Sequence, residues 1–285
     1  MEFRKPGPVA GWGRTPGGAY SAIIASAARA ELPARLREPA YRAFARAVGA
    51  DLGEAELELP AYRSFGDLFA RRLRPGVRPI DPAPDAIIAP CDGVVAASGR
   101  ASDGVLVQAK GHTYELVELV VDEVRAARLV GGPYTTIYLS PRDYHRVHAP
   151  EGGELLGYDY VPGALWPVNP RVAARRPRLF ARNERVVIWL ATARGLCAVV
   201  MIGAAGVGNI RLFGPGAPDS ATLRGRGELR RIELGGVRVA RGDELGAFRL
   251  GSTVVLAFEP GALRGELDCA PGDLVRFGER IGASA

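Results

Sequence analysis

The sequence predicts an α+β fold that is mainly β, in which a helical N-terminal region packs on a β-rich body of the sandwich or barrel-hybrid kind. Two observations support this fold class. The 37 glycines and 22 prolines fall between short apolar runs, which is typical of strands joined by turns. Helical patterning is concentrated near the N-terminus. With 285 residues and 47% hydrophobic content the chain can bury a real core, so we expect a helical region over residues 1–75 and a β-rich domain over residues 76–285.

The N-terminal region is predicted to form short amphipathic helices. Residues 20–48 are alanine-rich with scattered apolar residues and arginines, and Pro33 and Pro39 are expected to divide them into two or three helices. Ser64 and Asp67 form a capping-box pattern that predicts another helix start. The apolar face of that helix is predicted to carry Phe65, Leu68, Phe69 and Leu73.

Short strands are predicted after residue 79, because apolar and β-branched runs alternate there with Gly, Pro, Asp and Asn. One helix is expected within this part, at roughly 116–127. The predicted strands are 94–98, 105–109, 134–139, 186–191, 196–202, 229–234 and 253–258.

A weak internal repeat is present near the C-terminus. Residues 239–246 and 275–282 share the pattern V-x-x-G-acid-x-aliphatic-G, and each predicts a turn that leads into a strand. Residues 89–95 form a further turn of this kind. By analogy alone, such elements resemble those of compact β-sandwich hybrids related to biotinyl and lipoyl domains.

The formal charge of +6 and the pI near 9.5 suit an anionic partner, although nearly all of this charge is arginine, as a biased genome composition would also give. The basic residues are not interleaved with aromatic ones, so no nucleic-acid partner is expected. Residues 1–13 lack the apolar core of a signal peptide. The most apolar stretch, 186–207, is interrupted by Arg194 and Gly195, so no transmembrane helix is expected.

The three cysteines, Cys91, Cys197 and Cys269, lie far apart and form no C-x-x-C pair, so neither a disulfide framework nor a zinc site is indicated. Histidine is also rare. His145 and His148 belong to one short segment, and their spacing indicates either a catalytic site or a metal site. A metal site would need a third ligand that no motif supplies, so no metal is expected.

A candidate nucleophile lies near the C-terminus. Ser252 follows Gly251 directly and opens the β-rich run 253–258, and the glycine allows a backbone geometry that would bring the hydroxyl close to the preceding carbonyl. No serine of the chain lies in G-x-S-x-G, the usual hydrolase elbow. An ordinary Gly-Ser turn before a strand is the alternative.

Several motifs together resemble phosphatidylserine decarboxylases, in the right order and over roughly residues 60 to 260. The LGST motif at 250–253 would be weak evidence by itself, whereas the full set makes chance agreement very improbable. The other matching segments are VRPID at 77–81, DG at 92–93, QAKGH at 108–112, YLSPRDYHRVH at 138–148, YVPG at 160–163 and LFARNER at 179–185.

The resemblance implies that the chain cuts itself between Gly251 and Ser252. In that chemistry Asp92 orients and charges His148, and His148 takes the proton of Ser252 as general base. The serine oxygen attacks the carbonyl of Gly251, the peptide becomes an ester, and elimination followed by hydrolysis leaves a covalent pyruvoyl group derived from Ser252.

The same resemblance implies a carboxy-lyase reaction in the β-rich domain. The pyruvoyl group forms a Schiff base with the amine of phosphatidylserine and accepts electrons as carbon dioxide leaves, so that phosphatidylethanolamine is the product. His145 is expected to donate a proton or to contact the headgroup.

A lipid substrate implies a peripheral protein on the cytoplasmic face of the cell membrane, with anionic lipid as its partner. The two cleaved chains are expected to stay together as a heterodimer, and a higher oligomer is left open. Some apolar residues of the helical region either dip into the bilayer interface or pack on the protein. These residues are Ile23, Ile24, Leu32, Phe44, Phe65 and Phe69.

Two other function classes stay open on the sequence. Asp92, His148 and Ser252 would also serve a hydrolase that acts on a separate substrate and keeps an intact chain. The biotinyl-like turns favour a non-catalytic module that binds lipid or a carrier.

Overall fold

The structure is a computed structural model, and it describes residues 26–28, 30–204, 210–213, 217, 228–249 and 252–285. Gly251, on the upstream side of the predicted cut, lies outside the described residues, as do Ile23 and Ile24. The described part is mainly β with few helices, which confirms the predicted fold class. Whether residues 1–75 and 76–285 form separate domains stays a prediction.

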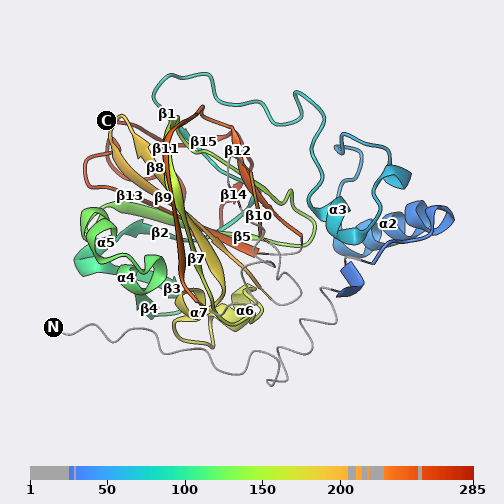
Figure 1. The fold of residues 1–285 in the computed structure, drawn as a ribbon, viewed down its shortest axis with the longest axis horizontal. Coiled ribbons are helices and arrows are strands. Elements are labelled where there is room, and N and C mark those ends of the chain that lie inside the picture. The colour runs from blue at the N-terminus through green and yellow to red at the C-terminus, as the bar shows by residue number, and fades with distance from the viewer. Residues whose placement is uncertain (1–25, 29, 205–209, 214–216, 218–227, 250–251) are drawn as a thin grey trace.

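The body is built on one large antiparallel sheet, which has eight strands among the described residues (Figure 1). Its neighbouring strands are, in order, β11 (Arg230–Val239), β7 (Gly153–Val161), β8 (Arg185–Thr192), β9 (Gly195–Ile202), β13 (Ser252–Phe258), β5 (Pro133–Leu139), β2 (Gly93–Arg100) and β14 (Leu274–Val275). Strands β9 and β13 are buried along almost their whole length. Their continuous apolar runs are therefore those of strands covered on both faces.

A smaller sheet packs on the large one. It has the order β10 (Ile210–Leu212), β12 (Glu244–Phe248), β6 (Arg146–His148). The two layers approach closely at Gly246 of β12, where an added Cβ would lie 2.8 Å from the sulfur of Met201 on β9. The body is therefore a β-sandwich at this point. Two short pairs complete it: β1 (Ala86–Ile88) with β15 (Arg280–Ala283), and β3 (Val105–Ala109) with β4 (His112–Glu115).

Short helices accompany the body. The helix expected over 116–127 is wrong as a single element, because Val121 takes a left-handed conformation with φ of 54° and separates α4 (Leu116–Val120) from α5 (Glu123–Leu129). Asp122 restarts the helix by accepting the backbone N–H of Arg125. The remaining short helices of the body are η2 (Ser102–Gly104), α6 (Pro170–Ala173) and α7 (Leu179–Arg182).

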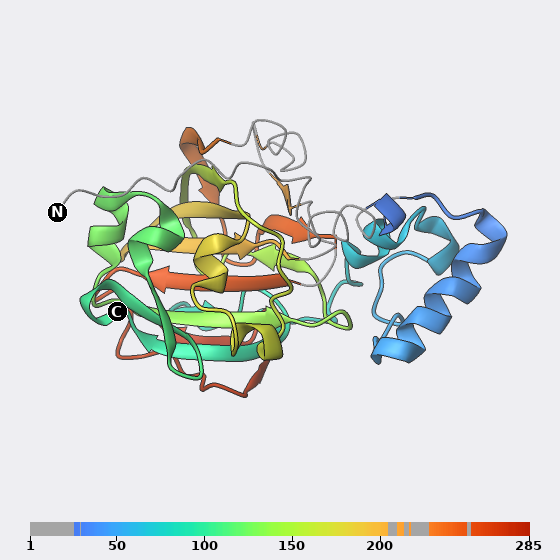
Figure 2. The same cartoon turned by 90° about the horizontal axis from the view of Figure 1, so that it is seen from below.

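The helical region stands to one side of the body (Figure 2). It contains α2 (Ala34–Val48), η1 (Leu59–Ala61) and α3 (Phe65–Phe69). The expectation that Pro39 breaks the helix is wrong, since α2 continues through it; a proline removes one N–H donor, and the neighbouring turns persist. Ser64 caps α3 as predicted, but α3 ends at Phe69, so Leu73 does not share its face.

This region has a small hydrophobic core of its own, formed by Tyr41, Ala55, Leu59, Tyr62 and Leu68. The ring of Phe44 packs on those of Phe65 and Phe69, at centroid distances of 5.6 and 5.4 Å. These three phenylalanines therefore pack against one another within the protein, and contact of Phe44 and Phe65 with the bilayer interface stays a prediction. Among the described residues, no helix has the length and apolar character needed to cross a bilayer.

Candidate active site

Strand register brings Asp92 and Ser252 to the same end of the large sheet. Asp92 directly precedes β2, and Ser252 opens β13. Both strands pair with β5, where Val94 lies opposite Tyr138 and Ser252 lies opposite Leu139. Neighbouring strands are about 4.8 Å apart, so the backbones at positions 92 and 252 are separated by roughly 10 Å across the end of β5.

His148 ends β6 and faces this same region, since its backbone N–H donates to the carbonyl of Pro90 at 2.8 Å. The imidazole Nδ1 lies 2.8 Å from the carbonyl oxygen of Gly242. A carbonyl only accepts, so Nδ1 carries the proton and Nε2 carries the lone pair. That lone pair accepts the hydroxyl of Tyr144 at 3.0 Å.

The His148 ring is neutral at pH 7. It is almost fully buried, and this burial lowers its pKa to about 4, although the bond to the carbonyl of Gly242 and the charge of Glu244 act in the opposite direction. The ring of Phe277 stacks on it at a centroid distance of 3.6 Å. A neutral imidazole in a fixed orientation is the form that a general base requires.

Asp92 is buried, and its carboxylate is fully engaged with other groups. It accepts from Nη2 of Arg78 at 2.7 Å and from the backbone N–H of Phe277 at 2.9 Å. Among the described residues these are its hydrogen-bond partners, and His148 is not one of them. The link between Asp92 and His148 runs through Phe277, whose backbone binds the carboxylate and whose ring stacks on the imidazole. A direct role of Asp92 in orienting His148 stays a prediction.

Ser252 has a side chain with no exposed surface, and its hydroxyl has no hydrogen-bond partner in the part of the chain that the structure describes. A buried hydroxyl normally has a partner, because leaving one unpaired costs about 1–3 kcal/mol. The unpaired hydroxyl is therefore an exception that calls for a functional reason. Its distance to the carbonyl of Gly251 lies outside what the structure describes.

His145 is also fully buried, and its ring packs edge-on against Phe69 of α3. Its Nδ1 donates to the carbonyl of Asp143 at 2.7 Å, which leaves the lone pair on Nε2, and no described residue is a hydrogen-bond partner of this Nε2. Burial lowers the pKa of His145 to about 3. In this state the ring offers an acceptor, while its expected roles as proton donor or headgroup contact stay predictions.

Several residues that shape the site were not predicted from the sequence. They are Arg78, Tyr144, Gly242 and Phe277. A signal was present for all four: Arg78 and Tyr144 lie in the motifs at 77–81 and 138–148, and Gly242 and Phe277 lie in the two copies of the V-x-x-G-acid repeat. In both copies the acidic side chain closes the turn on a backbone N–H three residues earlier, as Asp243 does with Ala240 and Glu279 does with Arg276. The repeat thus builds the two turns that hold His148 and Asp92.

Comparisons with known proteins place this geometry in context. Residues 65–283 match the family model for phosphatidylserine decarboxylase. The chain is 46% identical over 270 residues to the phosphatidylserine decarboxylase proenzyme of Anaeromyxobacter sp. (strain K), with 95% of each chain covered. It is 42% identical over 269 residues to the protein of the same name from Myxococcus xanthus (strain DK1622), with 94% of each covered. The one from Ectopseudomonas mendocina (strain ymp) is 42% identical over 246 residues, which are 84% of this chain and 85% of that protein.

Proposed function

Because this chain belongs to the phosphatidylserine decarboxylase family, we propose that it converts phosphatidylserine to phosphatidylethanolamine and carbon dioxide through a pyruvoyl group made from its own Ser252. One observation carries the self-processing part of this proposal. The buried hydroxyl of Ser252 has no hydrogen-bond partner among the residues that the structure describes, and it lies at the end of the sheet where a neutral His148 is held.

In the cutting step the oxygen of Ser252 bonds to the carbonyl carbon of Gly251, and the proton of the Ser252 hydroxyl passes to the lone pair on His148. The Tyr144 hydroxyl occupies that lone pair, so the proton reaches His148 through this hydroxyl or by displacing it. The C–N bond then breaks as the amine of residue 252 takes this proton from His148, and an ester joins the two segments. Transfer of the Cα proton of residue 252 to His148 or a neighbouring base expels the carboxylate of Gly251, and water converts the resulting dehydroalanine to the pyruvoyl group with release of ammonia.

The surroundings of Ser252 fit a small ketone at the start of β13. The side chain is enclosed, and no donor of the described residues competes for its oxygen. When formed, the pyruvoyl carbonyl supplies an electrophile for the substrate amine and an acceptor for the electrons released with carbon dioxide. Since Ser252 is fully buried in the intact chain, we expect the cut to open the path by which the amine arrives.

The two fragments are proposed to remain one heterodimer. Strand β13, which would begin the small fragment, is hydrogen-bonded to β5 on one side and to β9 on the other. The same fragment contributes β14, paired with β2, and β15, paired with β1. The net charge of +6 supports a peripheral position on anionic lipid, which we place at the cytoplasmic face of the membrane.

The proposal is tested by the intact mass of the purified protein and of Ser252→Ala. We expect the first to separate into two chains under denaturing conditions, the smaller one blocked at its first residue, and Ser252→Ala to stay at full length without releasing carbon dioxide. Ser220→Ala is a matched control and should be processed normally. A Ser252→Ala protein that is still divided at this position would disprove the assignment of the nucleophile.

A further inference from the structure

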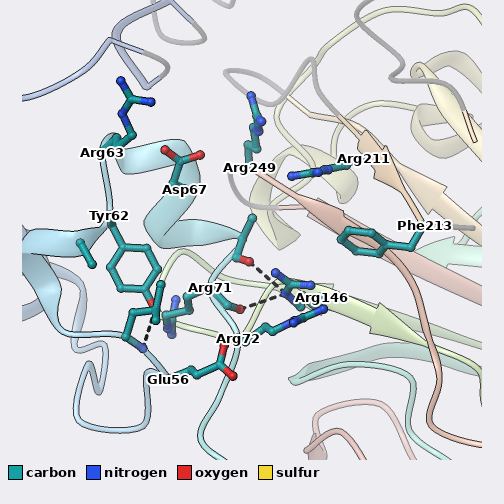
Figure 3. Close-up of a pocket in the computed structure, with 13 residues that line it drawn as sticks. Glu56, Tyr62, Arg63, Asp67, Arg71, Arg72, Arg146, Arg211, Phe213 and Arg249 are labelled. Carbon is teal, nitrogen blue, oxygen red and sulfur yellow. Dashed lines mark hydrogen bonds between the residues drawn. The ribbon is translucent and has the colours of Figure 1, made fainter.

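A cavity of about 360 Å³ lies between the helical region and the body (Figure 3). Arginines line it from both sides, and they are Arg63, Arg71, Arg72, Arg146, Arg211 and Arg249. Among the described residues, two carboxylates, those of Glu56 and Asp67, line it as well. This excess of guanidinium groups in a concave site creates a positive potential that attracts anions.

Half of these arginines have no acidic partner among the described residues. Arg63 pairs with Glu31, whereas Arg72 and Arg146 share Glu244. Within the described part of the chain, no carboxylate lies at ion-pair distance from the other three, which are Arg71, Arg211 and Arg249. Their charges are therefore available to a ligand.

Arg71 is the clearest indication of a missing acceptor. It is only 5% exposed, and its Nε has no hydrogen-bond partner within the described ranges. Its Nη1 makes one long bond, of 3.4 Å, to the carbonyl of Leu68. A buried charged donor without an acceptor is costly, and an anionic oxygen in the cavity would satisfy it.

Two arginines on the opposite wall are held in place by an aromatic ring. Phe213 lies beneath the guanidinium groups of Arg146 and Arg211, at 5.1 and 5.6 Å from its centroid. Arg146 also donates to the carbonyl of Ala70 in the segment after α3, which joins the two walls. Arginine heads fixed in this way are preorganised for the tetrahedral oxygens of a phosphate.

The cavity is close to the candidate active site. Arg146 and His148 are two residues apart on β6 and share one face of that strand. Arg249 precedes Ser252 by three residues, so their Cα atoms are at most roughly 10 Å apart. In phosphatidylserine only the serine carbons and one oxygen separate the amine from the phosphate.

We propose that this cavity binds the phosphate of the substrate headgroup while the amine reaches residue 252, an inference that rests on the proposed function. The arginines then select the substrate by its phosphodiester, and the helical region supplies half of that subsite through Arg63, Arg71 and Arg72. The phosphate would accept the unpaired Nε–H of Arg71.

The test measures binding in the uncut Ser252→Ala protein, so that it does not depend on processing. The cavity is present in the intact chain, so the phosphate contact can be measured there before the path of the amine to residue 252 is open. Isothermal titration would use monomeric dihexanoyl phosphatidylserine, inorganic phosphate, and dihexanoylglycerol as the ligand without phosphate. We expect the double variant Arg71→Gln, Arg211→Gln to bind the lipid with a Kd about tenfold higher or more. Each charge-assisted hydrogen bond to phosphate contributes on the order of a factor of ten to the affinity. Dihexanoylglycerol should not distinguish the proteins.

The matched control removes the same charge elsewhere, by Arg42→Gln on α2 combined with Arg238→Gln on β11, two exposed arginines outside the cavity. Arg211→Gln alone provides a second variant, because Arg211 is exposed and its replacement should not disturb folding. Equal lipid affinity in the cavity variants and the control would overturn the inference. Weakened binding of inorganic phosphate with unchanged lipid binding would show a free-phosphate site instead, and would also overturn it.

The two proposals fail in different ways. If the wild-type protein binds the lipid in the cavity but releases no carbon dioxide, the proposed function is refuted and the proposed subsite is not. Release of carbon dioxide by wild type, with a KM for dihexanoyl phosphatidylserine that Arg211→Gln does not raise, would refute the subsite alone.

Discussion

The chemistry of His148 is set by two hydrogen bonds and by its burial. Gly242 fixes the proton on Nδ1, Tyr144 occupies Nε2, and burial keeps the ring neutral. The sequence could indicate His148, because histidine is rare in the chain and the surrounding motif is long. It could not indicate Tyr144 as a partner, since residues four apart meet only if the segment between them turns, and no pattern in it predicted a turn.

Tyr144→Phe tests whether this hydroxyl takes part in self-cutting. Burial raises the pKa of Tyr144, so its proton stays in place and is donated to His148. We expect the variant to cut more slowly, on the order of 100-fold, because the imidazole loses the group that directs its lone pair and relays the proton. The rate of cutting is measured from the fraction of cut chain over time on denaturing gels.

Tyr158→Phe is the matched control for that experiment. Tyr158 is equally buried and its hydroxyl donates to the carbonyl of Phe213, outside the catalytic cluster. Removal of the Tyr158 hydroxyl should lower the free energy of unfolding by about 1 kcal/mol and leave the rate of cutting unchanged. Equal rates for Tyr144→Phe and wild type would show that the Tyr144 hydroxyl has no part in the transfer.

At the scale of elements, tight turns hold the site, and part of this could be predicted. The repeat in 239–246 and 275–282 was visible as a pattern, and the structure shows the same acid-closed turn in both copies. A third such turn, closed by Asp273 on the N–H of Ala270, lacks the full pattern and was missed. That the turns face His148 and Asp92 depends on strand pairing, which one sequence does not reveal.

Gly242→Ala should damage both the turn and the site. Gly242 has φ of +88°, and an added Cβ would lie 2.3 Å from Cδ1 of Ile80. We expect a loss of stability of about 1–3 kcal/mol from the backbone conformation, and slower cutting because the carbonyl that orients His148 moves. The loss of stability is measured by urea unfolding of the Ser252→Ala protein with and without Gly242→Ala. The rate of cutting is measured on denaturing gels of the protein that retains Ser252.

Ile80→Ala separates the two causes. It removes the side chain that the new Cβ meets, whereas the positive φ remains. The double variant should therefore recover part of the lost cutting rate and only part of the stability. Full recovery would mean that the contact alone, and not the left-handed backbone, requires glycine at this position.

At the scale of the whole molecule, burial decides what the sequence could predict. Strands β9 and β13 were predicted because they are continuous apolar runs in the core of the sheet. The short strand β6 was missed, because three residues of mixed polarity show no period. Strand β12 was predicted only as the strand that follows the turn in 239–246. The arginine-lined cavity was also missed, since its walls come from segments up to 193 positions apart, from Glu56 to Arg249, and only the fold joins them.

Burial also predicts how the molecule responds to acid. The pKa values of His145 and His148 fall to about 3 and about 4 on folding, whereas an unfolded histidine titrates near 6.5. Between these values the unfolded chain binds more protons than the folded one, so stability should decrease as the pH falls below about 6.5. From pH 7 to pH 5 each histidine should account for a loss of about 2 kcal/mol.

His145→Phe should reduce this acid sensitivity, because phenylalanine does not titrate and its ring fills the place beside Phe69. The measurement is the free energy of unfolding in urea at pH 7 and pH 5, made in the Ser252→Ala background so that a single chain unfolds. We expect the loss between the two pH values to be smaller by about 2 kcal/mol in the variant than in its parent. An identical loss in both proteins would show that His145 gains no proton on unfolding, and that its ring is not held neutral by burial.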